Sequence, residues 1–230
     1  MIHIFYRHYP ISEREHWRPD WFDYEKCFLN LLESIGDKDN VRINVVYDGN
    51  KDSNFIFKYD LNFYYIDAKS DYESFKKTLD IIKESNIEDD QIVYLLENDY
   101  LHVKNWDIEV EEFMKTKNES YLSLYDHNDK YSNEYSELMS KIIVTKTHHF
   151  RTTPSTCGSF ITTKKTLLED YSAHYNSPEI TKVFSDMPID HAKFLLLKSL
   201  KNRGVYTPVP GFSTHCLVNL LSPTINWENV

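Results

Sequence analysis

The sequence has only five glycines in 230 residues. Dinucleotide-binding folds and P-loop proteins cradle phosphates with glycine-rich loops, because only glycine lets the backbone approach that closely. Neither a GxGxxG pattern nor a Walker sequence is present. A nucleotide site of either of these two kinds therefore has no support in the sequence.

Cysteine is also scarce. Cys27, Cys157 and Cys216 are far apart and odd in number, and no CxxC pair occurs. These features argue against a disulfide framework and against a zinc site. The opening MIHIFYRHYP has neither the basic region nor the long apolar region of a signal peptide. A reducing, cytoplasmic location is therefore expected.

Basic residues are outnumbered. The chain has 26 Lys and Arg against 36 Asp and Glu, a formal net charge of −10. Such a charge repels polyanions, so nucleic acid is not an expected partner. The longest apolar runs are about five residues, whereas a membrane span needs about 20. No membrane span is expected either.

Core-forming residues are abundant. Hydrophobic residues make up 41% of the chain and aromatic residues 15%. This is enough for a packed core, and 230 residues suit one α/β domain better than two.

The first half alternates strand-like and helix-like segments. Strands are expected at residues 2–6, 41–47, 55–59, 62–66 and 92–96, and helices at 21–35, 72–85 and 106–114. Asp20 is a plausible cap for the first helix and Gly36 a plausible stop. The alternation predicts a mostly parallel sheet with right-handed crossovers.

The second half is less regular. Strands are expected at residues 121–125 and 159–162, helices at 163–171 and 189–203, and a loop at 128–134. Gly204 lies where a helix C-cap belongs. This half suits substrate binding on the same sheet.

The most informative segment is QIVYLLENDY. Five apolar residues, 92–96, end at Glu97-Asn98-Asp99. The run suits a central strand, and its carboxylates must emerge at the strand's C-terminal edge, where open α/β sheets bind ligands. Two carboxylates there indicate a divalent cation and a phosphate-bearing substrate. The alternative is a solvated acidic turn.

Two neighbouring strand ends carry similar groups. Asp48 follows residues 41–47, and Tyr6 and Arg7 end the first strand. An aspartate there can accept hydrogen bonds from a base or ribose, and an arginine can pair with phosphate. The alternatives are an Asx turn for Asp48 and a surface charge for Arg7.

Together, IFYRHY, VVYDG and YLLENDY resemble the nucleotide-binding half of GT-A glycosyltransferases, as found in phages, large DNA viruses and bacteria. In that family a DxD motif holds Mn²⁺ or Mg²⁺, which bridges the diphosphate of a nucleotide-sugar. The resemblance implies that Asp99 is a metal ligand, and that Glu97 faces the metal or the ribose. Glu replaces the first Asp of the motif. Asp48 would bind the base or ribose, with Tyr6, Arg7 and Asn98 beside it.

The C-terminal half extends the resemblance. The segment 153–160 resembles the family's small-residue stretch beneath the donor sugar, where Gly158 allows close approach. The resemblance implies a catalytic base at Asp190, with Asp186 second, and a metal ligand at His215. The alternatives are a helix cap for the aspartates and a structural role for His215.

The implied activity is metal-dependent transfer of a sugar from a nucleotide-diphosphate sugar to a hydroxyl of a glycan or glycoprotein, with inversion. Residues 1–115 would bind the donor, and residues 116–230 the acceptor and the catalytic base. Arg151 would support the diphosphate and His148 and His149 the acceptor. Exposed-looking aromatics for sugar stacking are Trp17, Trp21 and Tyr131.

Two other functions remain open. Acidic and histidine residues could form a metal-dependent phosphoester hydrolase site: Glu97, Asp99, Asp190, His191 and His215. Metal-dependent phosphatase activity without an acceptor would favour it. The chain could instead be a nucleotide- or glycan-binding module without turnover, which tight nucleotide binding without transfer would favour.

Overall fold

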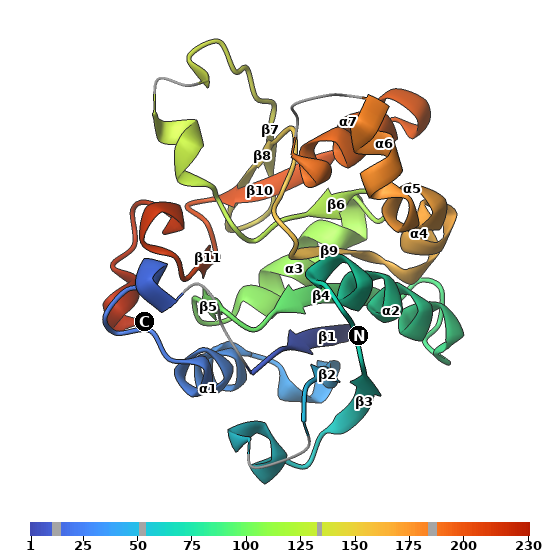
Figure 1. Ribbon diagram of the computed structural model, residues 1–230. Helices are drawn as coiled ribbons and strands as arrows, with labels where there is room; N and C mark the ends of the chain where they lie inside the picture. The colour runs from blue at the N-terminus through green and yellow to red at the C-terminus, as the bar shows by residue number, and fades with distance from the viewer. Residues whose placement is uncertain (11–14, 51–53, 133–134, 184–187) are drawn as a thin grey trace.

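The computed structural model describes residues 1–10, 15–50, 54–132, 135–183 and 188–230. Asp186 therefore lies outside the described residues. Within them, a nine-stranded sheet forms the centre of the molecule, and helices cover both of its faces (Figure 1).

The sheet has a parallel half and a mixed half. Its strand order is β3 (Asn62–Ile66), β2 (Val41–Asp48), β1 (Ile2–His8), β4 (Ile92–Glu97), β9 (Phe160–Thr163), β6 (Tyr121–Leu122), β10 (Val205–Val209), β8 (His149–Thr152) and β7 (Ile142–Val144). The first four strands are mutually parallel. β9 runs antiparallel to both of its neighbours, and β10 pairs parallel with β6. The predicted α/β fold, a mostly parallel sheet flanked by helices, is confirmed.

Each face of the sheet has its own core. Along β1 the side chains alternate, so Ile4 packs into one core and Phe5 into the other. α1 (Tyr24–Ser34) and α3 (Trp106–Thr116) contribute to the first core. The helices α2 (Asp71–Glu84), α4 (Lys164–Glu169) and α7 (Ile189–Lys201) contribute to the second. Two further short helices are α5 (Tyr171–Tyr175) and α6 (Ser177–Val183).

A second, two-stranded sheet extends the site edge. β5 (Tyr100–His102) follows β4 after a two-residue turn and pairs antiparallel with β11 (Ser213–His215) from the C-terminal segment. This pairing places β11 of the C-terminal segment next to the acidic cluster Glu97-Asn98-Asp99.

Three local expectations are wrong. Residues 55–59 are not a strand, because Asn54 caps Ile56 N and starts the 3-10 helix Phe55–Lys58. The cap of α1 is Asp23 rather than Asp20.

The third error concerns a helix end. α7 ends at Asn202, which has the left-handed conformation that we expected of Gly204. In all three cases a nearby Asn or Asp forms the helix cap, because these residues are favoured at caps and turns.

Among the described residues, no helix is both long enough and apolar enough to cross a membrane.

Candidate functional site

The C-terminal ends of β1, β2 and β4 meet at one edge of the sheet. The register pairs Arg7 with both Val46 and Glu97, so the three strands end level with one another. A pocket of about 440 Å³ opens there. Its wall contains six of the predicted residues: Arg7, Asp48, Glu97, Asn98, Asp99 and His215.

Asp99 has two cationic partners. Its Oδ2 lies 3.0 Å from Nε2 of His215 and 2.8 Å from Nη1 of Arg18. Although burial opposes ionisation, these two partners hold the pKa of Asp99 well below its usual value. Conversely, Asp99 raises the pKa of His215 against the effect of burial. Its other oxygen, Oδ1, is buried and has no hydrogen-bond partner among the described residues.

Glu97 faces Arg7 and Gly158. Burial raises the pKa of Glu97 to about 7, and Asp99 adds to this, while Arg7, 3.6 Å away, opposes it. A Cβ at Gly158 would lie 2.6 Å from Glu97 Oε1. The small-residue segment therefore meets the acidic cluster, and a side chain at position 158 would require the Glu97 carboxylate to shift.

The opposite wall is the start of α2. Arg7 pairs with the carboxylate of Asp71 and donates to its backbone oxygen at 3.0 Å. Ser70 caps the helix, and Lys69 also lines the pocket. Ala68 N donates to Oδ1 of Asp48 at 3.0 Å. The pocket thus combines carboxylates with basic side chains and a helix N-terminus.

Tyr6 lies beneath this pocket rather than in its wall. Its ring packs against Phe28 in the core, and its hydroxyl donates to Asn98 O at 3.3 Å. Asn98 in turn donates to Tyr9 O at 2.9 Å. Tyr6 therefore supports the turn that carries the acidic cluster.

Asp190 lies in a second pocket, of about 330 Å³, which also contains Cys157. Its Oδ1 is 2.7 Å from Nζ of Lys193, whose side chain is only 2% exposed. Next to Asp190, Nδ1 of His191 lies 3.1 Å from Ser155 Oγ. Because Gly158 meets Glu97 and Cys157 lines the second pocket, one short segment borders both pockets.

Arg151 also belongs to the second pocket, where it pairs with Asp126. Two other proposed accessory residues, His148 and Trp21, lie elsewhere. His148 pairs with Glu109 at 2.9 Å, and Trp21 packs into a small cluster with Cys27. Neither lines either pocket.

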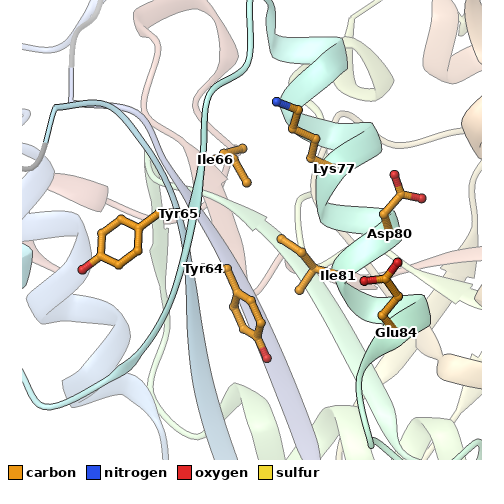
Figure 2. A pocket seen from close by; sticks show the side chains of 7 residues that line it. All are labelled: Tyr64, Tyr65, Ile66, Lys77, Asp80, Ile81 and Glu84. Carbon is orange, nitrogen blue, oxygen red and sulfur yellow. The ribbon is translucent and has the colours of Figure 1, made fainter.

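Sequence reasoning missed Arg18 and the start of α2. Arg18 comes from an irregular segment whose side-chain positions no periodicity predicts. Another pocket, of about 280 Å³, lies between β3 and α2 (Figure 2). Its lining, which includes Tyr64, Lys77 and Asp80, contains none of the predicted site residues.

No group of three or more His, Cys, Asp or Glu side chains within the described parts of the chain is close enough to hold a metal ion. The metal prediction rests on a smaller set, the Asp99–His215 pair, in a pocket that Glu97 also lines.

No family model matches the chain. No curated protein matches it either. Solved structures do resemble it. The 1–349 fragment of S. aureus TarS, a GT-A glycosyltransferase, is 13% identical with a TM-score of 0.51 over 90% of this chain. This chain spans about 59% of that fragment.

Two nucleotidyltransferases are similar to the same degree. CMP:2-keto-3-deoxy-manno-octonic acid synthetase, complexed with CTP, is 12% identical with a TM-score of 0.50, covering 90% of this chain and 88% of that one. The 2-C-methyl-D-erythritol 4-phosphate cytidylyltransferase of Francisella tularensis is 14% identical with a TM-score of 0.50, covering 99% of both chains. At such identities the likeness concerns the fold. The chain has a GT-A-like, Rossmann-type fold.

Proposed function

We propose that this protein is a transferase that uses a nucleotide-activated substrate, and that it transfers a sugar from a nucleotide-diphosphate sugar to a hydroxyl. One observation carries the proposal. Asp99, His215 and Glu97 converge beside Asp48 at the carboxyl edge of the parallel strands. In open α/β sheets this edge is where ligands bind.

The first pocket suits the donor. Asp48 keeps one carboxylate oxygen beyond its bond to Ala68 N, and a ribose hydroxyl or a base can donate to it. Arg7 and Lys69 supply positive charge for phosphates from the same wall. All but one of the lining residues come from the first 99 positions, which supports the assignment of residues 1–115 to donor binding.

The acidic cluster contains side chains of the kinds that bind divalent cations. Two carboxylates and an imidazole share the pocket, and Oδ1 of Asp99 is a buried oxygen without a partner among the described residues. We propose that Asp99 and His215, with Glu97, hold Mn²⁺ or Mg²⁺. Such an ion neutralises charge on a leaving diphosphate. Without the ion, Arg18 supplies a positive charge at Asp99.

The second pocket suits the acceptor, a hydroxyl on a glycan or glycoprotein. Its lining residues lie between positions 125 and 207, which supports the assignment of residues 116–230 to this role. Asp190 is the proposed base: its carboxylate takes the proton of the acceptor hydroxyl as the hydroxyl oxygen bonds to the anomeric carbon. The bond from that carbon to the nucleoside diphosphate breaks on the opposite face, so the diphosphate leaves and the anomeric centre is inverted. The buried ammonium of Lys193 fixes the orientation of that carboxylate.

The test separates binding from transfer. Asp190→Asn should reduce sugar transfer by at least 100-fold while nucleotide binding stays within twofold. Asp129→Asn, in the same pocket, is the matched control and should retain much more activity. If Asp190→Asn transfers as fast as the parent, Asp190 is not the base.

Nucleotidyl transfer is a second candidate. The fold likeness to two cytidylyltransferases over most of their length favours it. That reaction consumes a nucleoside triphosphate and releases pyrophosphate, whereas glycosyl transfer releases a nucleoside diphosphate. Product analysis after incubation with each class of donor distinguishes them.

A further inference from the structure

The edge strand β7 exposes apolar side chains. Ile142 is 57% exposed and Val144 is 64% exposed, and Met139, just before the strand, is 94% exposed. Ile143, between them, points to the other face, since its cross-strand partner is Phe150, which is fully buried. Exposed apolar residues clustered on an edge strand are typical of an interaction surface.

This surface is continuous with the second pocket. Thr207 of β10 pairs with Arg151 of β8, and Arg151 pairs with Ile142 of β7. Cross-strand partners lie on the same face of a sheet, so one row runs from Thr207 and Arg151, which line the pocket, to Ile142. The next row, Val209, His149 and Val144, runs alongside.

The charge of this region differs from that of the whole chain. Residues 138–152 contain no acidic residue, but they contain Lys141, Lys146 and Arg151, in a chain with a net charge of −10. Lys141 and Lys146 flank β7 and are exposed. Neither ammonium group has an ion-pair partner in the part of the chain that the structure describes.

Acidic residues of the adjacent helix α3 are already engaged. Glu109 pairs with His148 and accepts from Thr147 Oγ1, and Glu112 accepts from Lys146 N. The two lysines are therefore available to an external anion.

We propose that the β7–β8 hairpin docks the protein onto an anionic phospholipid surface. Ile142 and Val144 would enter the interface between head groups and acyl chains, while Lys141 and Lys146 contact the phosphates. A second copy of this chain is a poorer occupant, because two antiparallel β7 edges would bring the lysines of each copy together. This inference rests on the proposed function, and the acceptor would then be a sugar or hydroxyl carried on a lipid. The Thr207–Arg151–Ile142 row would connect the lipid surface to the second pocket.

Vesicle co-sedimentation of the full chain tests the docking. The probes are vesicles of phosphatidylcholine alone and vesicles with 30% phosphatidylglycerol. The protein should sediment with the anionic vesicles only, and 0.5 M NaCl should reduce the bound fraction at least threefold. Ile142→Ser with Val144→Ser should reduce it at least fivefold.

Leu200→Ser with Val218→Ser is the matched control, since these residues are 73% and 53% exposed on other elements. It should bind vesicles as the parent does, and all variants should melt within a few degrees of it. Absence of parent binding to anionic vesicles, or equal loss in both double variants, would overturn the proposal. The proposal would also be overturned if the parent is a dimer that Ile142→Ser with Val144→Ser dissociates, since a second copy would then cover this face. Nucleotide-induced stabilisation of the same samples reports on the proposed function independently.

Discussion

Oδ2 of Asp99 lies 3.0 Å from Nε2 of His215, although 116 residues separate the two in the chain. The pairing of β5 with β11 explains the approach, because it places His215 opposite Tyr100, the residue after Asp99. Cys216 N also donates to Asp99 O at 2.9 Å. Backbone pairing thus fixes the distance between the two side chains that we propose as metal ligands.

Arg18 and a metal ion would compete for Asp99. Because the Arg18 guanidinium lies 2.8 Å from Oδ2, its charge opposes a second cation at that carboxylate. Arg18→Gln should therefore bind Mn²⁺ severalfold more tightly than the parent in isothermal titration calorimetry without nucleotide. Arg42→Gln is the control, since Arg42 bonds only to nearby backbone oxygens. Unchanged or weaker Mn²⁺ binding by Arg18→Gln would show that the arginine does not compete.

Gly158 leaves room for Glu97. In Gly158→Ala the new Cβ would meet Oε1 of Glu97 at 2.6 Å, so the carboxylate that faces Arg7 must shift. We expect a loss of about 1–3 kcal/mol in the free energy of unfolding, together with at least tenfold weaker nucleotide binding.

Gly204→Ala is the matched variant for this test. Its Cβ would also meet an atom at 2.6 Å, on the ring of Tyr206, which lines neither site pocket. Both variants should lose stability in urea denaturation, but only Gly158→Ala should lose nucleotide affinity. Equal nucleotide affinities of the Gly158→Ala and Gly204→Ala variants would show that Glu97 is not part of the nucleotide-binding site.

Buried histidines predict acid sensitivity. Burial lowers the pKa of His102 to about 3 and that of His8 to about 4, from 6.5. Below pH 6.5 the unfolded chain binds protons that the folded chain does not, so the free energy of unfolding falls with pH down to each folded pKa. The slope is up to about 1.4 kcal/mol per pH unit for each histidine.

His102→Gln should reduce this slope between pH 6 and pH 4 in urea denaturation. The substitution removes the titrating group beside the Tyr94 hydroxyl, which lies 2.9 Å from His102 Nε2. The exposed His149 provides the control, and His149→Gln should leave the slope unchanged. A parent protein equally stable at pH 7 and pH 4.5 would contradict the prediction.

Much of the first pocket follows from the sequence, because parallel strands present their carboxyl ends at one edge. That rule alone brings together Arg7, Asp48 and Glu97, as the structure confirms. The same strands also show why Tyr6 fails to line the pocket. Neighbouring residues on a strand face opposite sides, so Tyr6 points to Phe28 while Arg7 points to the start of α2.

The remaining features depend on irregular backbone. Arg18 precedes α1, and its approach to Asp99 follows from tertiary packing rather than from a periodic pattern. Residues 55–58 are aromatic enough for a strand, but the Asn54 cap sets a helical turn. Asp190 is predicted as the base of the acceptor-binding half, and the structure places it in the second pocket, paired with Lys193.

The most direct test of the proposed function is a thermal-shift measurement with nucleoside diphosphates, with and without Mn²⁺. One diphosphate should stabilise the parent only when Mn²⁺ is present, by about 2.7 kcal/mol at 100 times its Kd. Asp99→Asn should abolish the Mn²⁺-dependent part, while Asp190→Asn should retain it. Stabilisation of the parent and of Asp99→Asn by the same amount, with or without Mn²⁺, would contradict the metal-dependent nucleotide site at Asp99 and His215.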